Sequence, residues 1–384
     1  MARAYTWEAL GRATLRRQFP RMRGRGADAV AELVRRVGPI QSQVARSPFV
    51  TVSSRLPGAT HAAITEAYES LGIVRGSSLR GTVHTSVRAQ HCLLDAVTRD
   101  AMEPGWRRQL KLDRATVADV QAGIEHFARD EWRTPSELRE HLIAWLGEHE
   151  GPSAAEAAAT TGVGRAFAHV HSGLIRRPRG SGAWDGQSAP VYRTASNVLG
   201  EPARAGLMPA EALVALTRQH LRAFGPANRR DVAWWTGEGL TRVDAALAAL
   251  RDELTDRPGP DGQTYFDVVK PPTGRAGDVG VRLLPEYDAA VVGYDPNSRD
   301  RFLDPAHLPQ IWMSANGMFS ASVLAGGRLV AAWKLVVDGA DKARRRIEVE
   351  MFPGVPRLAE ADLTDQVWAL ESALDVEVVD IVIR

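Results

Sequence analysis

The chain has 384 residues, of which 44% are hydrophobic and 24% are charged, and its formal net charge at pH 7 is +2. A chain of this length can bury several cores and corresponds to roughly two to four domains. No apolar run reaches the length of a membrane span, and residues 1–20 lack the apolar segment of a signal peptide. The single cysteine, Cys92, excludes an internal disulfide and a cysteine-rich zinc site. We therefore expect a cytoplasmic protein that does not enter a membrane.

Positive charge is concentrated at the start of the chain. Between residues 3 and 25 the only acidic residue is Glu8, and the basic residues are Arg3, Arg12, Arg16, Arg17, Arg21, Arg23 and Arg25. Clustered arginines suit contact with nucleic-acid phosphates, and Arg16 and Arg17 are the candidates that we select. A solvated helix face explains the same charges equally well.

Two helices are predicted before the first unusual segment. Apolar residues at helical spacing predict one helix over residues 5–19 and a second over residues 28–37. Gly38-Pro39 stops the second helix, and Gln41-Ser42-Gln43 follows. Glutamine amides donate and accept hydrogen bonds but have no useful pKa, so this pair can orient a ligand or a water and cannot act as a general acid or base. An isolated pair of this kind more often satisfies backbone groups at a helix end.

The next segment has the pattern of a β-hairpin. Alternation predicts a strand over residues 50–56, and residues 61–70 return to helix. Two short β-prone pieces lie between residues 73 and 84, around Gly76-Ser77-Ser78, and fit the wing of a winged-helix module. His84 has two interpretations, which are a buried histidine bonded to backbone and a residue beside a functional pocket.

A second unit repeats this order of elements. Residues 110–146 are predicted to be helical with a break near residues 132–135. Further helices over 153–162 and 163–172 precede a second wing hairpin over residues 174–193.

This second unit offers candidates for DNA contact and none for a metal. Its wing carries Arg176 and Arg177, which could contact phosphates. His169 and His171 are not on one helical face, and no third ligand lies nearby in the sequence. We therefore expect no metal site.

A third unit has the same pattern. Helices are predicted over residues 210–224, 227–235 and 241–254, and a hairpin over 256–269 follows. Helix, helix, helix and wing is the order of a winged-helix module. Within this unit, Trp234 and Trp235 are either core residues or base-stacking aromatics, and core packing is the commoner role.

Beyond a linker at residues 271–277, the chain becomes rich in strands. The predicted strands are 279–284, 289–294, 318–324, 328–337, 346–352 and 376–384, with one helix at 359–372. We therefore expect an α+β fold in which tandem winged-helix (helix-turn-helix) modules precede a β-rich, barrel-like C-terminal domain. The predicted domains are residues 1–109, 110–204, 205–272 and 278–384.

Four short segments resemble one known family. They are residues 38–49, the segment Leu79-Arg80-Gly81-Thr82-Val83-His84, and residues 283–288 and 316–319. In these segments the chain is similar to the bacterial winged-helix DNA glycosylases related to the azinomycin-resistance protein AlkZ and its YcaQ-like relatives. The catalytic motif of that family is a glutamine, an apolar residue and a glutamine or aspartate. Gln41 and Gln43 occupy the two polar places, whereas Ser42 stands where the family usually has an apolar side chain.

The resemblance implies a DNA glycosylase with Gln41 and Gln43 as catalytic residues. It adds Arg46, Arg80, Thr82 and His84 to the candidate DNA-binding or pocket-lining residues. The implied partner is duplex DNA that carries purines alkylated on the ring nitrogen exposed in the major groove. Bulky adducts and interstrand crosslinks formed by a genotoxic natural product belong to this class. No cofactor is implied, and we expect a monomer.

Missing motifs leave two classes of function. The sequence has no nucleotide-binding P-loop, no serine-hydrolase elbow and no His-Glu-x-x-His zinc helix. A non-catalytic winged-helix transcriptional regulator is the alternative to the enzyme, but regulators usually dimerise to read paired half-sites. Three tandem modules with an uncharged glutamine pair favour the glycosylase. Lysine is scarce and absent from both N-terminal motifs, so we expect a monofunctional enzyme that leaves the DNA strand intact.

Overall fold

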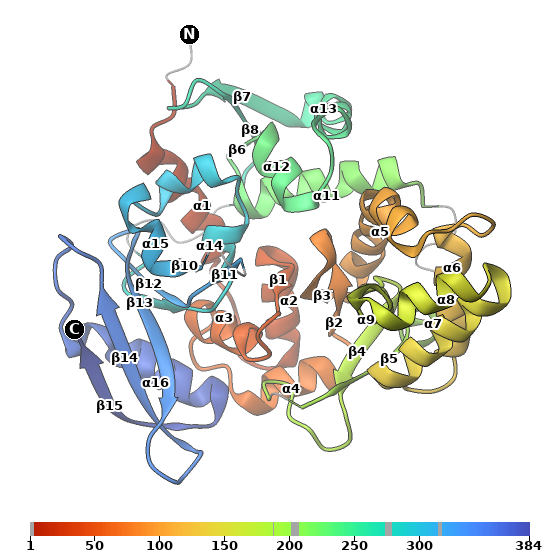
Figure 1. Ribbon diagram of the computed structural model, residues 1–384. Helices are drawn as coiled ribbons and strands as arrows, with labels where there is room; N and C mark the ends of the chain where they lie inside the picture. Colours follow the sequence, from red (N-terminus) through yellow and green to blue (C-terminus); the bar gives the residue numbers. More distant parts are fainter. Residues whose placement is uncertain (1–3, 187, 201–206, 273–278, 314–316) are drawn as a thin grey trace.

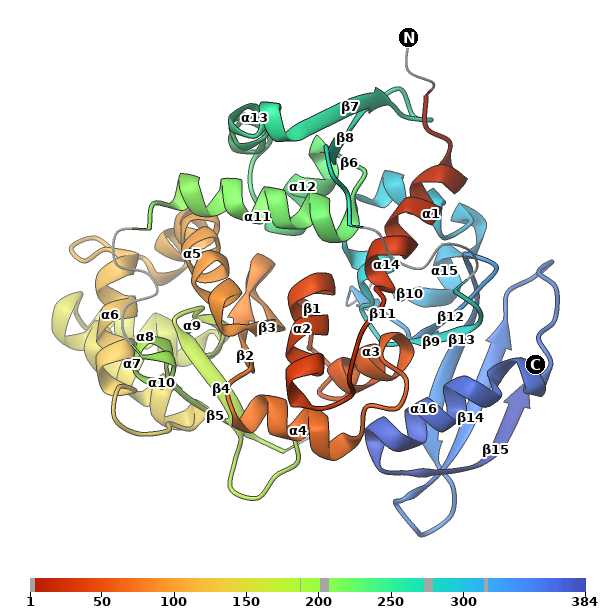
Figure 2. The same cartoon turned by 180° about the vertical axis from the view of Figure 1, so that it is seen from behind.

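The computed structural model describes residues 4–186, 188–200, 207–272, 279–313 and 317–384. Figure 1 shows the C-terminal sheet on one side of the molecule, the helices of residues 88–170 on the other, and the elements of residues 209–268 above. The N-terminal helices and strands lie between these groups, and Figure 2 shows the same arrangement from behind. Within the described ranges, no helix is both long and apolar enough to cross a membrane.

The first two helices are where the sequence predicts them. Helix α1 spans Trp7–Gln18 and is capped by Thr6, whose side chain accepts a hydrogen bond from the backbone of Ala9. Helix α2 spans Ala27–Val37 and ends at Gly38. Its apolar stripe is buried, as the spacing requires.

The elements after α2 form the first unit. They are β1 (Ile40–Gln41), α3 (Ser47–Arg55), α4 (His61–Glu69), β2 (Ile73–Ser78) and β3 (Thr82–Val87). The predicted hairpin is confirmed as β2 and β3, and β1 pairs with β3 so that Gln41 lies opposite His84. The strand predicted over residues 50–56 is wrong, because this segment is α3. Every residue of α3 is buried, so no polar face reveals its helical period.

The predicted position of the hairpin turn is also wrong. Gly76-Ser77-Ser78 lies inside β2, and the chain turns at Leu79–Gly81 instead. Gly76 serves close packing, since a Cβ there would lie 3.0 Å from the carbonyl oxygen of Leu174 and 3.3 Å from the ring of His91.

The second unit shares its sheet with the first. Its elements are α5 (Arg88–Leu110), α6 (Val117–Phe127), α7 (Pro135–His149), α8 (Pro152–Thr160), α9 (Gly162–Val170), β4 (Leu174–Pro178), β5 (Pro190–Thr194) and α10 (Ala195–Leu199). The second hairpin is confirmed, and the capping box of Thr134 and Glu137 starts α7. Strand β4 pairs with β2, so the order β1-β3-β2-β4-β5 joins both hairpins in one sheet. The sequence predicts neither this pairing nor α5.

The third unit has the order of elements that the first has. It contains α11 (Pro209–Phe224), β6 (Ala227–Asn228), α12 (Arg229–Thr236), α13 (Leu240–Ala249), β7 (Leu254–Pro258) and β8 (Thr264–Val268). In both units a cis Gly-Pro bond precedes the two-residue strand, and that strand pairs with the last strand of the hairpin. This order is compatible with winged-helix modules, and their assignment stays a prediction. The predicted boundaries at residues 204, 205 and 278 lie outside the described residues.

The C-terminal region is an open sheet. Its elements are β9 (Arg282–Leu284), α14 (Ala289–Val292), α15 (Leu308–Ile311), β10 (Trp312–Met313), β11 (Met318–Phe319), β12 (Ser322–Ala325), β13 (Arg328–Val337), β14 (Arg344–Met351), α16 (Thr364–Leu374) and β15 (Glu377–Ile383). The expectation of a barrel is wrong, because the strand order β15-β14-β13-β12-β9 leaves β15 and β9 as edges. The strand predicted at 289–294 is also wrong. Asp288 caps α14 there, and the short apolar run carries no helical period.

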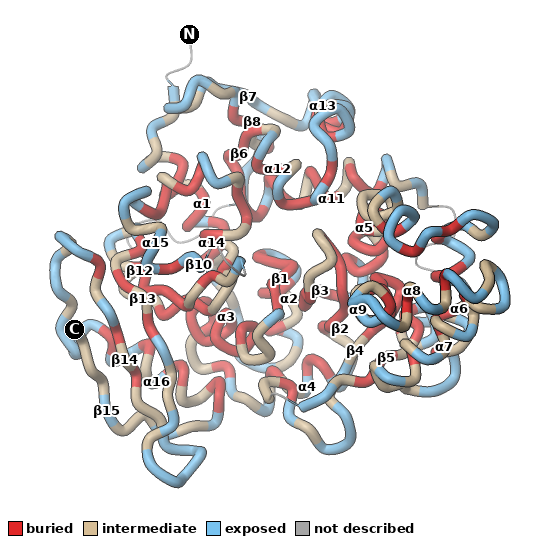
Figure 3. Tube along the Cα trace, viewed as in Figure 1, coloured by how far each residue is buried: buried red, intermediate tan, exposed pale blue. Residues whose placement is uncertain are grey.

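The N-terminal unit and the C-terminal sheet share one core. Apolar residues of α2, α3 and α4 pack in the same cluster as residues of β13, β14 and α16. Figure 3 shows buried segments gathered where these elements meet, whereas β7, α13 and the outer loops are exposed. A buried ion pair crosses the same junction, since Arg55 of α3 donates to both carboxylate oxygens of Asp288 at 3.0 and 2.9 Å. Both side chains are 1% exposed.

We expect Asp288→Ala to lower the free energy of unfolding by about 3 to 5 kcal/mol, because the charge of Arg55 would stay buried without its partner. Urea unfolding followed by tryptophan fluorescence measures the change. Glu8→Ala is the control, because it removes the exposed Glu8–Arg12 pair within α1 and should change the free energy by less than about 1 kcal/mol. Equal losses in the two variants would contradict this account.

Candidate functional site

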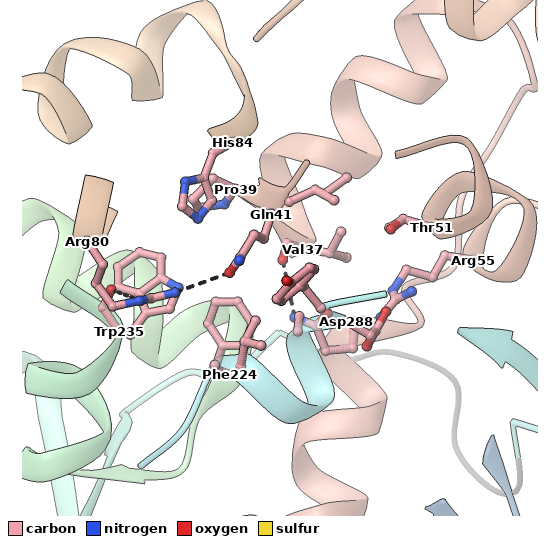
Figure 4. A pocket seen from close by; sticks show the side chains of 16 residues that line it. Val37, Pro39, Gln41, Thr51, Arg55, Arg80, His84, Phe224, Trp235 and Asp288 are labelled. Atoms are coloured by element: carbon pink, nitrogen blue, oxygen red, sulfur yellow. Dashed lines mark hydrogen bonds and ion pairs between the residues drawn. The ribbon is translucent and has the colours of Figure 1, made fainter. Parts of the chain in front are cut away.

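Gln41 lies at a small cavity where three parts of the chain meet. Strand β1 carries the side chain, which is 8% exposed, between Arg80 and Phe224 (Figure 4). The cavity is lined by Gln18, Val37, Pro39, Ile40, Gln41, Thr51, Arg55, Arg80, His84, Phe224, Trp235, Tyr287, Asp288, Ala289, Val292 and Gly293. Its volume is about 20 Å³, which is room for about one water. A purine base is far larger, so this cavity can hold a water and not an extruded base.

Arg80 fixes the amide of Gln41. Its Nη2 donates to the Oε1 of Gln41 at 3.4 Å, and its Nη1 donates to the backbone carbonyls of Trp234, at 3.2 Å, and Trp235. These carbonyls belong to the last turn of α12, where unpaired carbonyls concentrate partial negative charge. The third unit therefore holds the guanidinium that orients a side chain of the first.

Gln43 and Ser42 have different environments. Gln43 is exposed, and its Oε1 accepts a hydrogen bond from the backbone N–H of Val83 at 3.1 Å. Ser42 is buried and donates to the Oγ1 of Thr85 at 2.8 Å, so a polar pair occupies the place where the resemblance leads us to expect an apolar side chain. The structure brings Gln41 to the cavity and leaves Gln43 outside its lining.

His84 is a neutral group beside the cavity. It is 4% exposed, and its Nδ1 lies 3.0 Å from the Oγ of Ser78 and 3.1 Å from the carbonyl oxygen of Thr82. Burial, together with the smaller effect of the nearby charge of Arg80, lowers the pKa of His84 to about 3. His84 is therefore buried and also lines the cavity, and its place beside a functional pocket stays a prediction.

Two carboxylates flank Tyr287, each is paired with an arginine, and only Asp288 of the two lines the cavity. Glu286 accepts a hydrogen bond from Arg46 at 2.5 Å, and Asp288 pairs with Arg55 as described above. Between them Tyr287 adopts a positive φ of 57° and lines the cavity. The resembling segments 38–49, 79–84 and 283–288 thus meet at one site, although Asn316 of the fourth segment lies outside the described residues.

The remaining candidates do not line this cavity. Arg176 and Arg177 lie on β4, where their guanidiniums stack over Tyr192 and Trp132. The Oγ1 of Thr82 donates to the carbonyl oxygen of Leu79.

Arg16 and Arg17 lie at a separate groove. Arg17 is buried and donates to both oxygens of Asp267 at 2.6 and 2.8 Å, whereas Arg16 is exposed. The groove has a volume of about 520 Å³, and its basic lining residues are Arg16, Arg17, Arg35, Arg36, Arg218 and Arg222. Sequence reasoning missed the last four, which are spread over α2 and α11 and form a cluster only in the fold.

The histidine pair that could have suggested a metal has other partners. His171 is hydrogen-bonded to Glu125 at 2.9 Å, and the ring of His169 stacks on Tyr192. Over the described ranges, no group of three or more His, Cys, Asp or Glu side chains is arranged to hold a metal ion.

Comparisons with known proteins support one family. The model of a family described as "DNA glycosylase AlkZ-like" matches residues 34–373. The structure of the Streptomyces sahachiroi DNA glycosylase AlkZ is similar over 100% of both chains, with a TM-score of 0.77 and 19% sequence identity. At this identity the structural match shows a shared mixed α+β fold. No curated protein matches the sequence.

Burial of neutral His84 should make folding sensitive to acid. The unfolded state binds a proton below about pH 6.5 and the folded state does not until about pH 3, so stability is lost as the pH falls through 6.5. At pH 5 this effect amounts to about 2 kcal/mol. We expect His84→Gln to lose less stability than the parent protein between pH 7.5 and 5, by about that amount, in urea unfolding.

The exposed residue His126 provides the control for this measurement. His126→Gln should lose as much stability as the parent protein over the same pH interval. An unchanged acid sensitivity in His84→Gln would show that His84 is not held neutral.

Proposed function

Because the chain belongs to the AlkZ-like DNA glycosylase family, we propose that it hydrolyses the N-glycosidic bond of cationic, ring-nitrogen-alkylated purines in duplex DNA. Interstrand crosslinks formed by a genotoxic natural product are substrates of the same chemistry. The enzyme is monofunctional and acts as a monomer. One observation carries the proposal, which is the buried amide of Gln41 at a cavity of about one water, beside a histidine that burial keeps neutral.

The groups around Gln41 suit catalysis by orientation. Alkylation on the ring nitrogen makes the purine positive, so the base leaves as a neutral molecule and needs no proton from an acid. The sugar gains positive, oxocarbenium-like character as the bond breaks. A water held by the Oε1 of Gln41 can then add to the anomeric carbon, and the proton that this water loses passes to bulk solvent after the bond forms. Gln43 at the exposed side can contact the same water or the sugar.

The ionisable groups near Gln41 are consistent with catalysis by orientation. Glu286 and Asp288 are each paired with an arginine, and His84 is neutral. A general acid or base would need a pKa near the working pH and access to the reacting atoms. The amide of Gln41 needs neither, because it acts through its dipole and its position.

The basic groove supports DNA binding next to this site. Residues of the groove are sequence neighbours of residues of the cavity, namely Arg17 beside Gln18 and Arg36 beside Val37. Arg35 and Arg36 share the single carboxylate of Glu32, so the groove keeps excess positive charge. Such a surface attracts the phosphate backbone without reading the sequence.

We expect Gln41→Ala and Gln43→Ala each to raise the barrier by about 2 to 4 kcal/mol, or roughly 30- to 1000-fold in rate, while DNA affinity stays nearly constant. The assay measures free base released from duplexes that carry methyl, bulky or crosslinked purine adducts. Gln109→Ala, which changes an exposed glutamine of α5, is the control and should keep the parent rate.

Three outcomes of that assay would count against the proposal. Near-parental rates in the double Gln41→Ala, Gln43→Ala variant would exclude the glutamines from catalysis. A covalent complex trapped by borohydride would show an amine nucleophile and contradict a monofunctional enzyme. Sequence-selective binding without release of any base would favour a transcriptional regulator.

If phosphates lie along the groove, Arg16→Gln combined with Arg222→Gln should reduce the slope of log affinity against log salt by about 0.9 for each phosphate that the variant no longer neutralises. Binding isotherms over a salt series on two unrelated duplexes measure this slope. Arg251→Gln, which removes an exposed arginine outside the groove, is the control. An equal slope in the double variant and the parent would remove the groove from the DNA-binding surface.

A further inference from the structure

Arg299 lies in a column of aromatic rings beside the site. It belongs to a 3-10 helix over Pro296–Arg301 and is 5% exposed. Its guanidinium lies 5.4 Å from the ring centroid of Trp234 and 4.9 Å from that of Phe319. Trp312 stacks on the outer face of this arrangement, with its ring 6.0 Å from Phe319 and nearly parallel to it. The column connects the end of α12 to the β10–β11 hairpin.

Arg299 and Arg80 contact the same residue. Arg80 donates to the backbone carbonyl of Trp234, and Arg299 lies over the ring of that tryptophan. Arg80 in turn holds the amide of Gln41. The charge of Arg299 acts on the guanidinium of Arg80. Arg80 is itself in direct contact with the candidate catalytic residue Gln41.

Neither cation has a carboxylate partner in the described part of the chain. The Nε of Arg299 donates to the carbonyl oxygen of Val291 at 3.0 Å, but its Nη2 is buried without a hydrogen bond. Among the described residues, no carboxylate oxygen lies within 4.0 Å of either guanidinium. The pKa of each arginine is lowered to about 10, mainly by burial, and the charge of Arg299 contributes to the lowering at Arg80.

The carboxylates near Arg299 have other roles. Asp231 is paired with Arg301 at 3.3 Å, and Asp295 caps the 3-10 helix through the backbone N–H of Asn297. Arg299 is buried and Arg80 is half-buried, and desolvation and mutual repulsion both oppose their charges. The charges of Asp295 and Asp231 offset this cost only in part, because neither carboxylate pairs with Arg299 directly. Such an arrangement persists where a bound anion supplies the missing charge.

We propose that Arg299 and Arg80 together bind one phosphodiester group of the DNA strand that carries the lesion. This proposal rests on the proposed function and names a residue that neither the glutamine motif nor the Arg80–His84 segment contains. The exposed faces of Trp234 and Trp312, at 39% and 38% exposure, flank this phosphate site. Arg299 is a positioning residue, because it does not touch the reacting atoms. It acts on them through the bound phosphate and through Arg80.

The bound phosphate has an electrostatic role in the reaction. An unneutralised guanidinium next to Gln41 opposes the positive charge that develops on the sugar in the transition state. A phosphodiester between Arg299 and Arg80 cancels that field. It also fixes Arg80, and hence the amide of Gln41, in one orientation. Loss of the site should therefore lower the rate of base release and not only the affinity for DNA.

A scan with single methylphosphonate linkages tests the site, because each linkage removes the charge of one phosphate. In the parent protein, one linkage near the lesion should lower kcat/KM about 10- to 100-fold. Arg299→Gln should show a similar loss on unmodified DNA and no further loss from that same linkage. Arg299→Lys, which keeps the charge, should recover part of the activity, whereas a purely structural loss would not depend on charge.

The matched control is Arg133→Gln, because Arg133 also lies over an aromatic ring, that of Phe127, but does not line the cavity. Its effect should be independent of every linkage. Two results would overturn the phosphate site. In the first, every methylphosphonate linkage lowers the kcat/KM of Arg299→Gln as much as it lowers that of the parent protein. In the second, Arg299→Gln keeps full activity on unmodified DNA. If the parent protein released no base, the proposed function would fail, and the same scan read as binding affinity would still decide the phosphate site.

Discussion

The hydrogen bonds of Arg80 are the contacts on which the site depends. They join the carbonyl end of α12 to the Oε1 of Gln41, so the orientation of the amide depends on the position of the third unit. Arg80 reaches both partners from the turn of the β2–β3 hairpin, where its φ of 58° lies in the left-handed region. That conformation is unfavourable for a side-chain-bearing residue, and the helix end compensates for it by offering partially negative acceptors.

The sequence predicts those elements whose signals are local. Helix α2, with one polar face, and α7, with its capping box, follow rules that involve only residues within a turn or two. The predictions that are wrong concern segments whose structure depends on tertiary contacts. Helix α3 is buried on every side, and Gly76 serves the approach of β4 and α5 instead of a turn. Strand patterns do not reveal whether the edge strands pair, so they do not distinguish the open C-terminal sheet from a barrel.

The candidate site was predictable only in part. The glutamine pair has weak physical meaning in isolation, and the family resemblance drew attention to it. The arginine and carboxylate partners could not be foreseen, since Arg55 and Asp288 are 233 residues apart and Arg46 and Glu286 are 240 apart. No spacing rule connects residues so distant in the chain. Their pairing becomes visible only when the C-terminal segment packs against α3.

Pairing and burial together explain how an amide can suffice for the proposed reaction. Among the described residues, Asp288 at the cavity and Glu286 beside it are held in salt bridges, and burial keeps His84 neutral, so the amide of Gln41 is left to act by orientation. An uncharged base such as uracil leaves as an anion and needs a proton or a strong donor to stabilise it. A cationic purine leaves as a neutral molecule and needs neither. If the proposed function holds, the chemistry of the walls selects the charge of the lesion before any contact with its shape. This proposed selectivity follows from the same ion pairs that hold the C-terminal segment against the first unit.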